Sequence, residues 1–208
     1  MVQLTTMTPV LDITTKAEQT KLIVVLDIDE TLIHSHPKLP TNSRSFTIKI
    51  NEWETCVSPR PHVDWFLREA SSKFELMTFT AGTESYASQI LDKLDPNKVY
   101  IKSRYYRHHC VRINDETFLK DLSRINSSLN RIVLVDNNII SFATHPDNGI
   151  PIKSFFGRDS EDVELKTLMH ILDELSNEPD VRPLLKMKYD IRKKLFGEEK
   201  VVGGESKL

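Results

Sequence analysis

Two acidic residues and a threonine stand at alternate positions of the segment LDIDETLIHSH. Asp27 follows directly on the apolar run KLIVVL, and Asp29 and Thr31 come after it at steps of two. In an open parallel sheet, ligands bind in the crevice beyond the carboxyl ends of the strands. If the apolar run is a strand, these three side chains lie where a site is expected.

Two further apolar runs end in polar side chains of the same kinds. FELMTFT, at 74–80, ends in Thr80, and RIVLVD, at 131–136, ends in Asp136 with Asn137 next to it. Parallel strands bring their carboxyl ends to one edge of a sheet. The three runs together predict a single site built from oxygen-bearing side chains.

The acidic residues of this site would repel one another unless a cation or a proton lay among them. Asp27, Asp29 and Asp136 offer only oxygen ligands, and no paired histidine or cysteine accompanies them. Hard oxygen ligands favour Mg²⁺ over zinc. Because aspartate after a strand is also a common helix cap or turn former, Asp29 taken alone fits either a structural or a chemical role.

The same apolar runs predict the scaffold. Continuous branched residues at 21–27, 74–80 and 131–136 are typical of strands buried on both faces of a parallel sheet. Helical patterns separate and follow these runs. We expect one helix in RPHVDWFLREASS, with Pro61 in its first turn, and a second in TESYASQILDKL, with Thr83 as its cap. A third helix is expected at 162–175, with an apolar side made of Val163, Leu165, Leu168, Met169 and Leu172. We therefore predict an α/β fold, a Rossmann-like, mostly parallel sheet flanked by helices.

Two segments depart from this pattern. Residues 36–60 hold a loop rich in Pro, Asn and Ser and then the alternating stretch SFTIKI, which predicts a small β-hairpin insert. The apolar side chains of this insert fit either a specificity pocket or simple packing. Residues 178–196 predict a basic helix broken near Pro183. We divide the chain into a polar N-terminal segment (1–19), a catalytic domain (20–185, with the insert at about 36–60), and a basic C-terminal helix with a frayed tail (186–208).

Composition limits the classes of protein. A chain of 208 residues with 39% apolar residues suits one domain around one core. The formal net charge of −2 predicts no direct nucleic-acid partner, and the two cysteines indicate a reducing compartment. Since no apolar run approaches the ~20 residues that span a bilayer, we expect no membrane segment in this chain and a cytoplasmic or nuclear location. The sequence leaves the oligomeric state open.

These motifs resemble those of a known group of enzymes. DIDET, at 27–31, matches the DxDxT signature of the haloacid-dehalogenase-like phosphatases. LDIDETLIHSH, RPHVDWFL, LMTFTAG, YYRHHC, LKDLSRI, VLVDNN and HPDNGIPIKSFF follow in the order found in the FCP homology branch of that superfamily, and look most like Dullard and the small CTD phosphatases. The likeness runs from about residue 20 to about residue 185, and it implies a haloacid-dehalogenase-like fold.

The resemblance implies catalytic roles for the first two acids. Asp27 would attack phosphorus and form an aspartyl-phosphate, with Mg²⁺ offsetting the charge between carboxylate and phosphate. Asp29 would protonate the leaving oxygen and later take a proton from the hydrolytic water. It would contact the metal through its backbone carbonyl. Asp136 and Asn137 match the other metal-side residues, so the implied metal set is Asp27, Asp29, Asp136 and Asn137.

The resemblance also implies a phosphate-binding set. Thr80 and Lys120 match positions that hold phosphate oxygens through a hydroxyl group and a fixed positive charge. Thr31 ends the DxDxT signature and belongs to the expected set. Arg107, in YYRHHC, fits either a phosphate contact or a solvated surface position, and we add it to the expected set apart from the resemblance. One departure lies beside it: the family reads Asp-Asn-Ser at 136–138, whereas this chain has Asn138, which can still donate and accept hydrogen bonds.

The implied function is that of a Mg²⁺-dependent protein serine/threonine phosphatase. The likeness to the small CTD phosphatases implies the repeat tail of RNA polymerase II as the phosphorylated protein substrate. The likeness to Dullard implies a Dullard-type phosphoprotein instead. Two alternatives stay open: a catalytically weak binding module related to a mitochondrial translocase subunit, and a small-metabolite phosphatase. The intact pair of Asp27 and Asp29 counts against the first, and an insert too short for a closing lid counts against the second.

Overall fold

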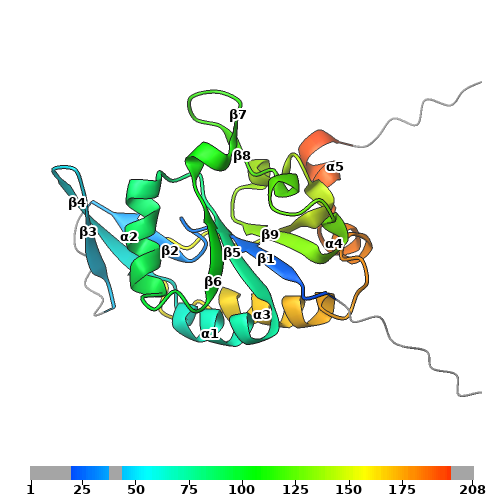
Figure 1. The fold of residues 1–208 in the computed structure, drawn as a ribbon, viewed down its shortest axis with the longest axis horizontal. Helices are drawn as coiled ribbons and strands as arrows, with labels where there is room; N and C mark the ends of the chain where they lie inside the picture. Colours follow the sequence, from blue (N-terminus) through cyan, green and yellow to red (C-terminus); the bar gives the residue numbers. More distant parts are fainter. Residues whose placement is uncertain (1–19, 38–43, 198–208) are drawn as a thin grey trace, which may run out of the picture.

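A five-stranded parallel sheet forms the centre of the protein (Figure 1). The structure, a computed structural model, describes residues 20–37 and 44–197. Within them the strand order is β10-β9-β1-β5-β6, and every neighbouring pair is parallel. The three apolar runs predicted as strands form its three central members. The strands are β1 (Ile23–Leu26), β5 (Glu75–Phe79), β6 (Ile101–Tyr105), β9 (Ile132–Asp136) and β10 (Gly149–Pro151).

Both faces of this sheet are covered, which explains the unbroken apolar sequence of β1. Val24 and Leu26 belong to one buried cluster, whereas Val25 between them belongs to the cluster on the other face. Helices α1 and α3 run side by side along one face of the sheet (Figure 1). The helices are α1 (Val63–Lys73), α2 (Glu84–Leu94), α3 (Glu164–Leu175), α4 (Arg182–Tyr189) and α5 (Ile191–Phe196). The predicted α/β architecture is therefore confirmed.

The helices differ from the predicted ones in three details. Helix α1 begins after His62, which has a left-handed backbone (φ 68°), so Pro61 precedes the helix instead of occupying its first turn. In α3, Val163 is the N-cap residue and is 51% exposed, whereas the other four predicted apolar residues are buried. The break in the basic C-terminal helix falls at Asp190 (φ 41°). Pro183 instead lies in the first turn of α4, where its missing N–H group removes no helical hydrogen bond.

The insert forms a sheet of its own. Strands β2 (Ile33–His36), β3 (Phe46–Ile50) and β4 (Trp53–Pro59) pair antiparallel in the order β2-β4-β3. The pair β3–β4 is the predicted hairpin, and β2 adds a third strand that the sequence pattern did not predict. Ile48 is buried in the core, while Trp53 is 79% exposed. For Ile48 the structure therefore supports simple packing.

Short elements complete the edge of the sheet and link its strands. Strands β7 (Val111–Arg112) and β8 (Phe118–Leu119) form an antiparallel pair. The 3₁₀-helices are η1 (Arg107–His109), η2 (Leu122–Arg124), η3 (Leu129–Arg131), η4 (Ile139–Phe142) and η5 (Pro146–Asn148). The expected domain boundary at residue 185 falls inside α4, and segments 1–19 and 198–208 lie outside the described residues. In the part of the chain that is described, no helix has the length and apolar character needed to cross a bilayer.

Arg60 ties the segment after the insert to the loop that carries the acidic motif. Its side chain is fully buried and pairs with Asp162 through two hydrogen bonds of 2.9 Å. The same guanidinium donates to the backbone carbonyls of Thr31, at 3.0 Å, and Lys153, at 2.8 Å. One side chain thus fixes the backbone at two loops beside the carboxyl end of β1.

Replacing Arg60 with methionine is expected to lower the free energy of unfolding by about 3 kcal/mol, because Asp162 would keep a buried charge without its partner. Urea denaturation followed by circular dichroism measures this loss. The double variant Arg60→Met/Asp162→Leu removes both charges and is expected to recover part of it. A single variant as stable as the wild type would show that this ion pair does not hold the loops together.

Candidate active site

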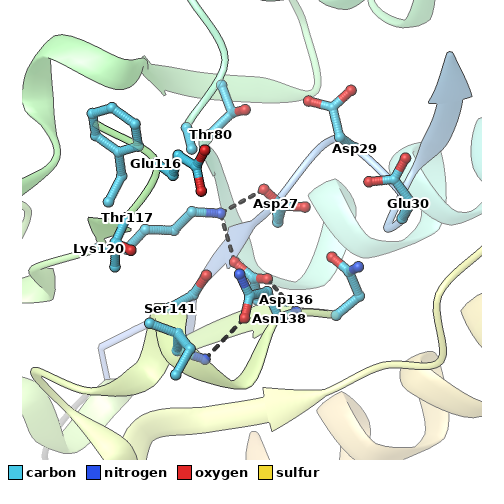
Figure 2. A pocket seen from close by; sticks show the side chains of 14 residues that line it. Asp27, Asp29, Glu30, Thr80, Glu116, Thr117, Lys120, Asp136, Asn138 and Ser141 are labelled. Carbon is cyan, nitrogen blue, oxygen red and sulfur yellow. Dashed lines mark hydrogen bonds and ion pairs between the residues drawn. The ribbon is translucent and has the colours of Figure 1, made fainter. Parts of the chain in front are cut away.

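A cleft of about 270 Å³ opens at the carboxyl ends of β1, β5 and β9 (Figure 2). Six of the eight predicted site residues line it, and Thr31 and Arg107 do not. The cleft is lined by Asp27, Asp29, Glu30, Thr80, Ala81, Glu116, Thr117, Phe118, Lys120, Asp136, Asn137, Asn138, Ile140 and Ser141. This cleft therefore lies at the sheet edge predicted from the strand ends.

Lys120 joins the two acids at the floor of the cleft. Its Nζ lies 2.5 Å from an oxygen of Asp27 and 2.6 Å from an oxygen of Asp136, and all three side chains are buried. Burial opposes the positive charge of Lys120, but the carboxylates of Asp136 and Asp27 outweigh it and raise its pKa. Burial also raises the pKa of Asp27 to about 7, even with Lys120 beside it. A second cation near Asp27 would favour the ionised carboxylate that nucleophilic attack requires.

A tight turn after β1 places Asp29 beside Asp27 in the cleft. Glu30 adopts a left-handed backbone (φ 56°), and its N–H group donates to the carbonyl of Ile33 at 2.8 Å. Burial raises the pKa of the Asp29 carboxyl above its usual range. A carboxyl that keeps its proton to higher pH is suited to donate that proton.

Thr80 brings a hydroxyl group to the cleft from the end of β5. The side chain is buried, and its Oγ1 accepts a hydrogen bond of 2.8 Å from the backbone N–H group of Gly82. Since the backbone supplies that hydrogen, the hydroxyl proton of Thr80 can be donated to a ligand. Thr80 and Lys120 both face the space around Asp27 (Figure 2).

The remaining predicted residues act beside the cleft rather than in its lining. Thr31 is fully buried, and its hydroxyl donates to Oδ1 of Asn137 at 3.4 Å. Asn137 in turn donates to the hydroxyl of Ser154 at 3.1 Å. The Nε of Arg107 donates to the carbonyl of Ala81 at 2.5 Å, and its guanidinium lies 5.1 Å from the centre of the Phe118 ring. In this arrangement Arg107 supports the wall of the cleft.

Asn138, the departure from the family pattern, has a clear local role. Its side-chain oxygen accepts a hydrogen bond of 3.1 Å from the N–H group of Ile140 and so caps η4. Its own N–H group donates to the carboxylate of Asp136 at 2.7 Å. Serine is also a good capping residue, so asparagine performs the same task at this position.

The loop carrying Lys120 is held by residues that the sequence patterns did not single out. The Thr144 hydroxyl donates to the backbone carbonyl of Lys120 at 2.9 Å. Nε2 of His145 lies 2.8 Å from the carboxylate of Asp121, which also caps η2 by accepting from Ser123. These contacts hold the chain at Lys120 and directly after it. Thr144 directly precedes the HPDNGIPIKSFF segment, and His145 is its first residue. Their contacts with the Lys120 loop depend on the three-dimensional fold and not on a sequence pattern.

Sequence reasoning also missed one wall of the cleft. Glu116 and Thr117 come from the turn of the β7–β8 hairpin, Phe118 begins β8, and Ile140 and Ser141 come from η4. Both segments are short, and neither shows a periodic pattern that would place it beside the strand ends.

The polar groups at the floor fit a hard divalent cation. Asp27 and Asp136 offer carboxylate oxygens, and the backbone carbonyl of Asp29 and the side chain of Asn137 complete the metal set that the resemblance implies. Asp27, Asp29 and Asp136 together with Lys120 carry a formal charge of −2 when ionised, which a divalent ion would neutralise. Among the described residues, no group of three or more His, Cys, Asp or Glu side chains could hold a metal by itself. Water and substrate oxygens would therefore complete the coordination, as Mg²⁺ commonly allows.

A parallel α/β sheet with an acidic, lysine-containing cleft at its carboxyl edge is the arrangement that the DxDxT resemblance predicts. Comparison with protein families agrees: residues 22–182 match the family model for NLI interacting factor-like phosphatases. The chain belongs to that family and is a phosphoprotein phosphatase by class. The predicted resemblance is therefore confirmed.

Individual relatives support the same assignment. CTD nuclear envelope phosphatase 1B of Danio rerio is 43% identical over 174 residues, which cover 78% of this chain and 70% of the relative. The carboxy-terminal domain RNA polymerase II polypeptide A small phosphatase 2 of Mus musculus is 37% identical, with 80% and 62% covered. The solved structure of Fcp1, an essential RNA polymerase II CTD phosphatase, superposes with a TM-score of 0.54 at 22% identity, covering 86% of this chain and 54% of that one. This last likeness shows the fold alone.

Proposed function

We propose that the chain is a Mg²⁺-dependent phosphatase of phosphoserine or phosphothreonine in proteins, and that it works through an aspartyl-phosphate on Asp27. The observation that carries the proposal is the floor of the cleft. There, a buried carboxylate with a raised pKa lies 2.5 Å from a buried ammonium group and beside a second acid, Asp136. Once a divalent cation offsets the carboxylates, such a site can hold the charged oxygens of a phosphate and present a nucleophile to its phosphorus.

In the first half-reaction, a carboxylate oxygen of Asp27 forms a bond to phosphorus while the bond from phosphorus to the ester oxygen breaks. The Asp29 carboxyl gives its proton to that departing oxygen, so the product leaves as a neutral alcohol. Lys120 and the Thr80 hydroxyl hold the phosphoryl oxygens as their charge shifts. Mg²⁺, which Asp27, Asp136, Asn137 and the Asp29 carbonyl would hold, would reduce the repulsion between carboxylate and phosphate.

In the second half-reaction, water attacks the phosphorus of the aspartyl-phosphate. The Asp29 carboxylate takes a proton from this water, and the bond from phosphorus to the Asp27 oxygen breaks. Phosphate leaves, Asp27 is again a carboxylate and Asp29 is again protonated. The cycle consumes one phosphate ester and one water and yields one alcohol and one phosphate.

The surroundings of the cleft favour a protein substrate. The insert sheet β2-β4-β3 is small, so a residue within a polypeptide could reach Asp27. Relatives named for the nuclear envelope and for the RNA polymerase II CTD both match, at 43% and 37% identity. We favour a phosphoprotein of the nuclear-envelope type, met in the nucleus or the cytoplasm, with the polymerase tail as the second candidate.

Removing the metal is expected to lower turnover by about a hundredfold or more, because the charge repulsion in the site then stays uncompensated. The test follows hydrolysis of para-nitrophenyl phosphate and of a phosphoserine peptide in EDTA, and again after Mg²⁺ is restored. Full activity in EDTA would contradict a metal-dependent site. A chain that binds phosphopeptide but never turns it over would favour the binding module, and a strong preference for sugar phosphates would favour a small-metabolite phosphatase.

A further inference from the structure

One phenol group fixes the carboxyl of Asp29. The hydroxyl of Tyr86 donates a hydrogen bond to Oδ1 of Asp29. Within residues 20–37 and 44–197, no other side chain donates to this carboxylate. Oδ2 is therefore left to exchange a proton with a ligand in the cleft. The Asp29 side chain points away from Lys120 and Asp136, which keeps its carboxyl apart from the ion pair at the floor (Figure 2).

Tyr86 is itself held by a second hydroxyl group. Oγ of Ser35 lies 2.5 Å from the Tyr86 oxygen. A phenol has one proton, and Tyr86 gives it to Asp29, so Ser35 is the donor in this second hydrogen bond. Burial and the neighbouring Asp29 raise the pKa of Tyr86, which keeps it a donor. The chain of hydrogen bonds thus runs from Ser35 through Tyr86 to Asp29.

The packing of the Tyr86 ring limits its freedom. Tyr86 lies in the first turn of α2, and its ring is partly buried against the main core. A methyl group added at Gly82 would lie 3.0 Å from Cδ1 of Tyr86 and 3.1 Å from Oγ1 of Thr80. Glycine at this position therefore lets the ring approach the cleft. The backbone of Ser35 is held as well, because it pairs with Val57 inside the insert sheet.

We propose that Tyr86, supported by Ser35, is a positioning residue that orients the Asp29 carboxyl toward the leaving oxygen of the substrate. This inference rests on the proposed function, in which Asp29 protonates that oxygen as its bond to phosphorus breaks. An unrestrained carboxyl rotates freely and spends less time in the productive orientation. The effect falls on leaving groups that need a proton, such as the serine alkoxide, and spares acidic phenols that depart as anions.

The experiment measures kcat/KM with Mg²⁺ for a series of substituted phenyl phosphates of similar size whose phenols differ in acidity. This constant reports the steps up to departure of the leaving group. Tyr86→Phe keeps the ring and removes the hydroxyl group. It is expected to leave kcat/KM unchanged for the most acidic phenol and to lower it about tenfold for the least acidic one. Ser35→Ala is expected to lower kcat/KM for the least acidic phenol by a smaller factor than Tyr86→Phe does. Asp29→Asn is expected to lower it by a larger factor.

Tyr100→Phe is the matched control, because Tyr100 borders a separate hollow lined by Phe74 and Lys102. In Tyr100→Phe, kcat/KM is expected to depend on leaving-group acidity in the same way as in the wild type. The inference would be overturned if the wild type is active and Tyr86→Phe shows the same dependence of kcat/KM on leaving-group acidity. An equal loss of kcat/KM for every substrate counts as the same dependence. The proposed function would still stand in that case. A wild type that hydrolyses none of the phenyl phosphates would overturn both.

Discussion

Asp27→Asn is expected to lower kcat by about 10⁴-fold or more, because an amide cannot form the acyl-phosphate bond. The substitution preserves the shape of the side chain, and its remaining oxygen can still accept the hydrogen bond that Lys120 donates at 2.5 Å. The fold should therefore persist. Mg²⁺-dependent hydrolysis of para-nitrophenyl phosphate measures the loss, and thermal unfolding followed by circular dichroism measures the stability.

The matched control for this variant is Asp115→Asn, which changes an aspartate whose side chain is 90% exposed in the β7–β8 turn. It is expected to keep wild-type activity. Acid quenching during turnover, followed by intact-protein mass spectrometry, should detect a phosphoryl adduct in the wild type and none in Asp27→Asn. If Asp27→Asn kept a tenth or more of the wild-type kcat, covalent chemistry at Asp27 would be excluded and Asp29 would have to activate water directly.

The strand ends were predictable because a buried parallel strand leaves a plain signature. β1 is apolar at every position since both of its faces are covered, and the first polar residue after it is Asp27. The same logic located Thr80 and Asp136. It failed for β6, an edge strand with the sequence IKSRY, and for β10, which has three residues and ends in Pro151. Edge strands face solvent on one side and need no continuous apolar run.

Side chains that reach the cleft from loops were not predictable from patterns. Lys120 was found through the resemblance alone, because it follows a strand of only two residues, β8. Tyr86 fits the helical pattern of α2, and nothing local indicates that its hydroxyl group meets Asp29, 57 positions away in the sequence. Arg107 was expected to bind phosphate; its Nε donates to the carbonyl of Ala81 and its guanidinium lies over the ring of Phe118, and its phosphate-binding role stays a prediction. The position of each depends on packing between distant segments.

Lys120→Met is expected to lower kcat/KM by about 10²- to 10³-fold, because the transferring phosphoryl group loses a fixed positive charge. Methionine keeps the length and apolar stem of the side chain while removing the ammonium group. Lys102→Met is the matched control, since that lysine is 64% exposed on β6, remote from the cleft, and should leave kcat/KM unchanged. Loss of activity in both variants would show that the assay responds to general charge rather than to this site.

Without Mg²⁺, Lys120→Met is expected to be less stable than the wild type, and the difference in stability is expected to grow as the pH rises. Burial already raises the pKa of Asp27 from 3.8 to about 7 with Lys120 present. A raised carboxyl pKa means that the folded chain binds the proton more tightly than the unfolded chain, so stability falls as the pH rises above about 4. Without Lys120 the ammonium group that lowers the pKa of Asp27 is lost while the repulsion from Asp136 remains, so this pKa rises further and the effect grows. Thermal unfolding between pH 5 and pH 8 tests the sign.

Mg²⁺ should then raise the melting temperature of Lys120→Met more than that of the wild type. Mg²⁺ and the Lys120 ammonium group would both neutralise Asp27 and Asp136. A site without the ammonium group therefore gains more stability from the metal. Because Mg²⁺ binds the folded state, this gain appears as a higher melting temperature. Lys120→Arg retains the charge and should resemble the wild type in this respect. Equal Mg²⁺-induced shifts in Lys120→Met and the wild type would show that metal and lysine do not share these carboxylates, and the proposed placement of the metal would be wrong.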